Sequence, residues 1–230
     1  MADEVSISNL TLSFLGDEAT VSSIDPPEGS AQAEHCAQFF PLARDALLEM
    51  HPWDFATKSL ALELQEETVR GWPYAYAKPA NCLKVLAVLP PNAGDDYSLS
   101  GANQGVLQAS DGTITTPFIN GYTSYTPQPF KTETSYSTGA QLILTRQAEA
   151  EGLCIFRVTD PSLFSPLFVI SLAKLLAAFV AGPIYKGETG AKMSALMMKH
   201  FEEFFSQAVA SNASQEHSDV QVAVPWIAGR

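Results

Sequence analysis

The chain has 230 residues, and its 25 acidic and 13 basic side chains give a formal net charge of −12. Apolar residues make up 46% of the sequence and charged residues 17%, which excludes disorder throughout, because disordered chains are poor in apolar residues and rich in charge. The acidic balance argues against tight nucleic-acid binding, which needs Lys and Arg side chains to neutralise phosphates. Three scattered cysteines predict neither a disulfide framework nor a zinc site, so we expect a reduced, intracellular protein.

Two helices are predicted near the N-terminus. The first covers residues 3–15 and ends at Gly16, which is a typical helix stop. The second begins at its cap, Ser30, and carries apolar residues at steps of three and four until His51-Pro52 ends it. Pro41 lies inside this helix, where it is expected to produce a kink.

The apolar period changes to that of strands in the middle of the chain. Segments bounded by Pro, Gly, Asn and Asp alternate or run apolar over four to eight residues, at 58–64, 82–89, 141–146 and 153–158. Residues 146–152 are expected to turn the last two of these strands back on each other. Tyr74 and Tyr76, next to Trp72, are expected on an edge strand that packs its aromatic rings on the helices.

Residues 92–140 are rich in Ser, Thr, Gly, Asn, Tyr and Pro, with Lys131 as the one cation. This composition predicts long loops with one or two hairpins, and Asp111-Gly112 is a favourable turn. Long loops in a compact domain are usually functional or mobile.

Helical periodicity returns near the C-terminus. We expect one helix from Asp160-Pro161 to Ala181, ended by Gly182-Pro183, and a second from a cap at Thr189 to about Ala210.

The stretch 163–182 is long and apolar enough to suggest a membrane span. Lys174 near its middle and Pro166 in its first turns disfavour that interpretation, because a charge inside a membrane is costly. The sequence therefore predicts no membrane span and a helix buried by its neighbours.

These elements predict an α+β fold, in which N- and C-terminal helices form a bundle with an inserted antiparallel β region. The bundle is expected to comprise residues 1–56 and 160–210. The inserted β region covers 57–159, and residues 211–230 form an extended C-terminal tail.

The sequence contains no convincing catalytic, cofactor-binding or metal-binding motif. His35 and Cys36 are adjacent on a predicted helix and therefore point in different directions. A hydrolase remains the alternative, and it would need converging carboxylates, for example Glu66, Glu67 or Asp95.

The apolar C-terminal peptide follows a polar stretch and is expected to bind a protein surface, either of its own domain or of another chain. Its alternating valines resemble an added strand, and its candidate docking residues are Val222, Val224, Trp226 and Ile227.

Three segments together resemble the tail tubular protein A family, the head-to-tail adaptors of short-tailed phages. These segments are residues 12–56, which end in HPWDFA, the stretch GWPYAYAKPANCLKVLAV at 71–88, and residues 159–187. The resemblance covers most of the chain, but it includes neither residues 92–140 nor the C-terminal tail.

The resemblance implies a structural virion protein of the tail or neck, assembled in the host cytoplasm, with no enzymatic activity and no cofactor. It implies a homo-oligomeric ring, typically a dodecamer, between the portal protein and a tail nozzle of the tail tubular protein B type. Tail fibres or spikes would dock on this ring, and genomic DNA would pass through its lumen without specific binding.

In this interpretation the helices 30–50 and 162–181 close the ring, the β region projects toward the nozzle, and the C-terminal peptide reaches the portal. The residues expected to pack within the bundle or between subunits are apolar and lie on these helices: Phe39, Leu47, Phe168, Leu172, Leu175, Leu176 and Phe179.

Overall fold

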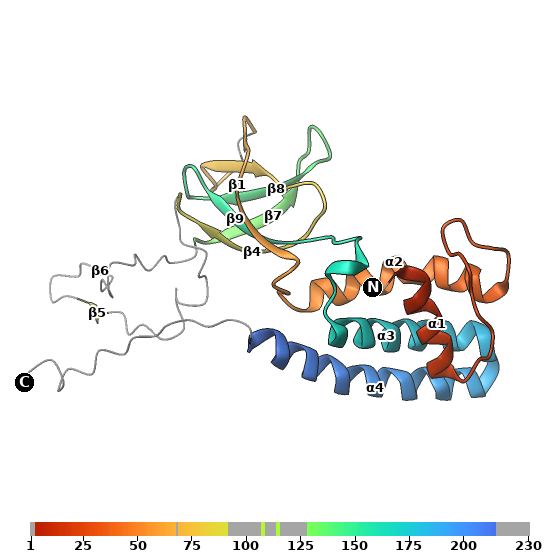
Figure 1. Ribbon diagram of the computed structural model, residues 1–230. Helices are drawn as coiled ribbons and strands as arrows, with labels where there is room; N and C mark the ends of the chain where they lie inside the picture. Colours follow the sequence, from red (N-terminus) through yellow and green to blue (C-terminus); the bar gives the residue numbers. More distant parts are fainter. Residues whose placement is uncertain (1–2, 68, 92–106, 109–113, 116–127, 215–230) are drawn as a thin grey trace, which may run out of the picture. The chain divides into compact units, whose positions relative to one another are not determined.

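The computed structural model describes residues 3–67, 69–91, 107–108, 114–115 and 128–214. It divides into two compact units. The helical unit contains the chain up to Arg44 and again from Asp160, and the β unit contains Asp45–Thr159. The fold is α+β, with helices from both ends of the chain in one unit and an inserted antiparallel β region, which confirms the predicted class (Figure 1).

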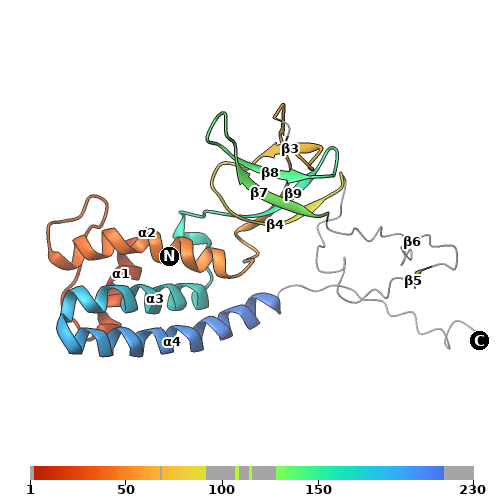
Figure 2. The ribbon, with the colours of Figure 1, turned by 180° about the vertical axis from the view of Figure 1, so that it is seen from behind.

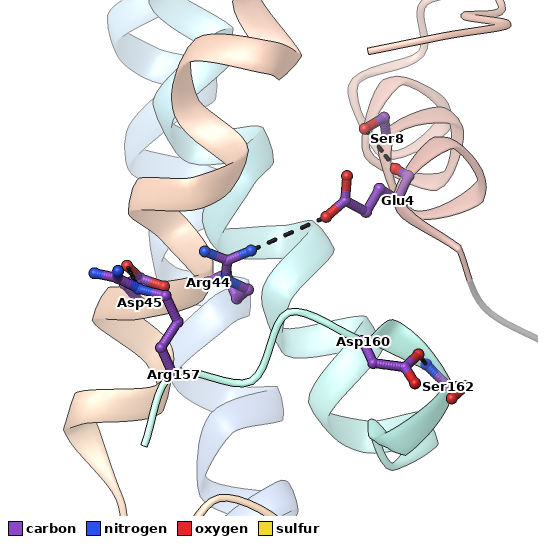
Figure 3. Close-up of polar contacts among 7 residues, drawn as sticks. All are labelled: Glu4, Ser8, Arg44, Asp45, Arg157, Asp160 and Ser162. Carbon is purple, nitrogen blue, oxygen red and sulfur yellow. Dashed lines mark hydrogen bonds and ion pairs between the residues drawn. The ribbon is translucent and has the colours of Figure 1, made fainter. Parts of the chain in front are cut away.

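The chain enters the β unit at Asp45, earlier than the expected boundary at residue 57. An ion pair of 2.7 Å between Asp45 Oδ2 and Arg157 Nε ties the start of this unit to its end (Figure 3). Trp53 is fully buried and donates its indole N–H to the carbonyl of Leu47 at 3.0 Å. The last turns of the second helix therefore belong with the strands that follow them.

Helix α1 (Glu4–Leu15) has a well-defined start and stop. Asp3 and Ser6 form a capping box, in which each side chain accepts a hydrogen bond from the other's backbone N–H, at 2.6 and 2.9 Å. At the other end Gly16 adopts φ 76°, a left-handed conformation that glycine takes without steric cost. Both ends agree with the prediction to within one residue.

Helix α2 (Ala31–Met50) begins where predicted, with the Ser30 hydroxyl accepting from the backbone N–H of Ala33 at 3.2 Å. The helix continues without a break through Pro41. Arg44 is 7% exposed and points toward Glu4 on α1, 4.0 Å from Nη1 to Oε1, so this charge pair joins the first two helices (Figure 3).

The predicted start at Asp160 marks only a short 3₁₀ helix, η2 (Pro161–Leu163). Helix α3 (Pro166–Tyr185) begins at a second cap, Ser165, whose hydroxyl accepts from the N–H of Phe168 at 3.3 Å. It also continues through Gly182 and Pro183, where a helix end was expected. Pro183 lies in the last turn of α3, so it removes one backbone hydrogen bond close to the end of the helix.

Helix α4 (Gly187–Ala213) follows at once, because Lys186 takes a positive φ of 52° and reverses the chain. Thr189 therefore lies inside its first turn and does not cap it. The two helices approach closely at Gly190, where a Cβ atom would meet the carbonyl oxygen of Ala181 at 3.1 Å. A hydrogen bond of 2.6 Å from the Ser194 hydroxyl to the carbonyl of Ala178 also joins them.

Helix α3 is the core of the helical unit. It lies between α2 and α4 in both views (Figures 1 and 2). The Phe39 ring of α2 lies 6.3 Å from that of Phe179, centroid to centroid. On α1, the Thr11 hydroxyl contacts the carbonyl of Ala173 at 3.2 Å. Within the described part of the chain, α3 is the one helix long and apolar enough to cross a membrane, and most of its apolar stretch is buried inside the fold.

Lys174 is the charged residue in the middle of this core helix, and it is 8% exposed. Its Nζ lies 3.4 Å from the centroid of the Phe14 ring of α1, a cation–π contact. Burial lowers the pKa of Lys174, because the protein interior disfavours the charged form. The aromatic face therefore offsets part of the cost of placing an ammonium group inside the unit.

The β unit contains nine strands among the described residues. Their bounds are β1 (Thr57–Ala61), β2 (Leu64–Gln65), β3 (Tyr74–Ala77), β4 (Cys82–Leu89), β5 (Leu107–Gln108), β6 (Ile114–Thr115), β7 (Phe130–Thr134), β8 (Gln141–Thr145) and β9 (Glu151–Phe156). They form antiparallel sheets of order β1-β9-β4 and β2-β3-β8-β7, together with the small pair β5-β6.

Two predictions about this unit are wrong. Strands β8 and β9 do not pair with each other, because residues 146–150 carry the chain from one sheet to the other. Strand β3 is internal to its sheet, and Tyr76 is buried in a core shared by both sheets rather than on the helices. That core contains Leu62, Tyr76, Val88, Ile143 and Ala150.

The Lys174–Phe14 contact predicts a measurable coupling. Replacing Phe14 by Leu removes the aromatic face and leaves the buried ammonium over an aliphatic side chain. We expect this change to destabilise the wild type more than it destabilises a Lys174→Met variant, by about 0.5–2 kcal/mol. Chemical unfolding of the four proteins measures the difference, and equal losses in both backgrounds would show that the contact contributes nothing.

Candidate interaction surfaces

Most residues predicted to pack in the bundle or between subunits are buried in the core of the chain itself. Leu47, Phe168, Leu172, Leu175 and Leu176 are each at most 2% exposed. A surface for a second chain must therefore come from other residues.

Two of the predicted packing residues, Phe39 and Phe179, are only half-buried. Their rings contact each other at the surface of the helical unit. The structure thus places a partly exposed aromatic pair where α2 meets α3.

The outward face of α2 carries an exposed leucine. Leu42 is 59% exposed, and the exposed Gln38 and Glu34 precede it at steps of four residues, so the three side chains follow one line along the helix. Phe39 lies beside this line. The sequence analysis did not single out Leu42, because it lies off the apolar stripe that was predicted for this helix.

The outward face of α4 carries a second exposed leucine. Leu196 is 45% exposed and lies between the exposed Lys192 and Lys199, again at steps of four and three. Lys192 is paired with Glu188 at 2.8 Å, but both side chains are at least 75% exposed, so the pair contributes little to stability.

The charged residues of the helical unit are unevenly distributed along the sequence. Residues 3–43 contain seven carboxylates and neither Lys nor Arg. Residues 186–200 contain three lysines and one glutamate. Of the seven carboxylates Glu4 lies on α1 and Glu34 on α2, and the other five lie outside these two helices. On α4, the exposed Glu202 and Glu203 follow the lysines.

The carboxylates named for a hydrolase do not converge in the described structure. Glu66 is exposed, whereas Glu67 is half-buried and accepts hydrogen bonds from the hydroxyls of Ser135 and Ser137, the latter at 3.3 Å. Asp95 lies outside the described residues. Glu67 has the environment of a structural acceptor that fixes the loop between β7 and β8.

His35 and Cys36 point in different directions, as predicted: the histidine is half-buried and the cysteine fully buried. Burial raises the pKa of the Cys36 thiol, which disfavours the reactive thiolate. Among the described residues, no group of three or more His, Cys, Asp or Glu side chains is placed to hold a metal ion.

The predicted docking residues of the C-terminal tail, Val222, Val224, Trp226 and Ile227, lie outside the described residues, as does the Asp111-Gly112 turn.

Sequence reasoning also missed a pair of thiols in the β unit. Cys82 and Cys154 are buried on the neighbouring strands β4 and β9, where the pairing is irregular around Cys82. A hydrogen bond from the Cys154 thiol and the positive charge of Lys78 lower the pKa of Cys82, whereas the same hydrogen bond and burial raise that of Cys154. The strand positions of both cysteines were predicted, but their pairing depends on register, which periodicity does not give.

Lys78 links this pair to a small open hollow on the β unit. Its Nζ donates to the carbonyl of Leu83 at 3.3 Å and to the Gln141 side chain at 2.9 Å. Thr132, Glu133 and Thr134 of β7 complete the lining of the hollow, which is polar and shallow.

No protein-family model matches this chain, and a search of curated proteins finds no match.

The thiol pair predicts an order of reactivity. Because its pKa is lowered, Cys82 should react with iodoacetamide before Cys36 and Cys154, as mass spectrometry of the peptides would show. Replacing Lys78 by Met removes the positive charge, so the pKa of Cys82 should rise and its alkylation at neutral pH should slow severalfold. Lys131→Met, elsewhere on the β unit, serves as the control. An unchanged pH profile in Lys78→Met would contradict the role given to this lysine.

Proposed function

We propose that the protein is a structural component of a phage virion, a head-to-tail adaptor that assembles into a ring between the portal and the tail nozzle. The ring continues the DNA channel and offers docking sites to tail fibres or spikes. The proposal starts from the three segments that resemble the tail tubular protein A family, which lie in both the helical and the β unit.

The observation that carries this proposal is the distribution of apolar surface on the helical unit. The unit already buries most of α3 against its own helices. It nevertheless leaves Leu42 and Leu196 about half exposed on two outer helices. In a closed ring such side chains would be covered by copies of the same chain.

The acidic charge of the chain also suits a channel through which DNA slides. A lumen wall must not hold phosphates, and a net charge of −12 repels them. This argument concerns the whole chain and does not assign particular residues to the lumen.

A tail-associated hydrolase acting on host cell-wall polymers is the alternative that the carboxylates suggested. No specific contact in the described structure favours it, since Glu67 is engaged by serines and Glu66 is exposed. Release of soluble fragments from peptidoglycan by the purified protein would support the alternative and contradict a purely structural role.

Light scattering coupled to size-exclusion chromatography tests the adaptor proposal. The purified chain is mixed with portal rings of the same virus, and the mass of the complex is compared with that of the portal alone. We expect an increase of many multiples of 24.8 kDa, because one chain would bind at each subunit of the portal. Failure to bind the portal at micromolar concentration would overturn the proposal.

The C-terminal peptide gives a second test of the same proposal. Removing residues 220–230 should weaken portal binding, while the melting temperature of the protein stays within about 1–2 °C of the wild type. A truncated protein that binds portals as tightly as the intact chain would show that the peptide has another role.

A further inference from the structure

Two of the three cysteines lie side by side in the β unit. Cys82 begins β4, and Cys154 lies on β9, the strand that pairs with β4. In the register Cys82 is opposite Phe156, and residues two apart on a strand point to the same face, so Cys82 and Cys154 share one face of the sheet. The Cys154 thiol donates a hydrogen bond to Cys82, which brings the two sulfur atoms into contact. Cysteines placed in this way are within reach of a disulfide bond.

The two thiols differ in accessibility and in charge environment. Cys82 is 9% exposed and Cys154 is 0% exposed, so an oxidant from solvent meets Cys82 first. The hydrogen bond from Cys154 and the nearby charge of Lys78 lower the pKa of Cys82, which favours its reactive thiolate. The same hydrogen bond and burial raise the pKa of Cys154, which keeps it a neutral thiol. The pair therefore contains one thiol suited to react with an oxidant and a second thiol in contact with it.

We propose that Cys82 and Cys154 form an oxidation site, at which a peroxide produces a disulfide bond that joins β4 to β9. This inference does not depend on the proposed virion function. The third cysteine, Cys36, belongs to the helical unit and is fully buried, so it has no part in the site.

The reaction with hydrogen peroxide takes two steps. The Cys82 sulfur first attacks one peroxide oxygen and the O–O bond breaks, which leaves Cys82 as a sulfenic acid, while the departing hydroxide takes up the proton of the Cys82 thiol and becomes water. The Cys154 sulfur then attacks the Cys82 sulfur. The S–S bond forms, the S–O bond breaks, and the hydroxyl group leaves with the Cys154 proton as a second water. The two thiols lose two electrons and two protons, and one peroxide is reduced to two waters.

Peptide mapping of the native, full-length protein tests the proposal. The protein is treated briefly with hydrogen peroxide, its remaining thiols are alkylated after unfolding, and the peptides are analysed by mass spectrometry. We expect a peptide pair linked through Cys82 and Cys154, an alkylated Cys36, and recovery of both thiols after treatment with dithiothreitol. Met50 is 51% exposed, so its conversion to the sulfoxide in the same sample shows that the peroxide has acted.

Three results would overturn the proposal. Cys82 and Cys154 could both remain alkylated in a sample in which Met50 is oxidised. Non-reducing electrophoresis could show that the disulfide joins two chains. Cys82 could also proceed to the sulfinic acid while Cys154 stays a free thiol.

Two variants separate the roles of the thiols. Cys154→Ala removes the second thiol, so the sulfenic acid of Cys82 should persist, and dimedone should label it at least severalfold more than in the wild type. Cys36→Ala is the matched control, because it also removes a buried thiol but should form the disulfide as fast as the wild type. Equal dimedone labelling of Cys154→Ala and the wild type would show that Cys154 does not attack Cys82. Peptide mapping of the wild type decides the proposal even if circular dichroism shows that a variant does not fold.

Thermal unfolding measures the consequence of the bond. The disulfide closes the chain between Cys82 and Cys154 into a loop, which reduces the conformational freedom of the unfolded state. The oxidised protein should therefore melt several degrees above the reduced protein, and dithiothreitol should reverse the shift. A melting temperature that does not rise on oxidation would contradict the idea that the bond holds β4 to β9.

Discussion

The burial of helix α3 is the constraint on which the rest of the structure depends. This helix is apolar on nearly all sides, and each of its buried leucines and phenylalanines stabilises the fold by about 1.5–3 kcal/mol. Three other helices must surround it, and two of them come from the opposite end of the chain. The intervening residues must therefore leave the helical unit and return to it, which makes the β region an insertion.

The sequence predicted the elements of this fold better than their partners. Helix periodicity and capping residues such as Asp3 and Ser30 act locally, so α1 and α2 were placed to within a residue. Pairing in sheets is not local: periodicity identified β8 and β9 as strands, but it did not indicate that residues 146–150 separate them into two sheets. The start of α3 was predicted at Asp160, but the helix begins at Pro166. Asp160 and Ser165 are both capping residues followed by Pro, and Ser165 is the one that caps the long helix.

The candidate surfaces show the same limit. Leu172 and Leu42 are both leucines on predicted helices, but one is fully buried and the other is 59% exposed. Apolarity predicts that a residue will be covered, and it does not say whether its own chain or another chain covers it. The polar candidates were easier to judge once their neighbours were known, since two serine hydroxyls engage Glu67 and burial raises the pKa of Cys36.

The ion pair between Asp45 and Arg157 has a consequence for how such a chain can change over time. These residues hold the first and last segments of the β unit side by side, with 2.7 Å between the charged atoms. A domain whose two ends are adjacent can be exchanged, enlarged or shortened while the host domain keeps its fold. Grafting a different β module between residues 44 and 160 is therefore expected to leave the helical scaffold unchanged.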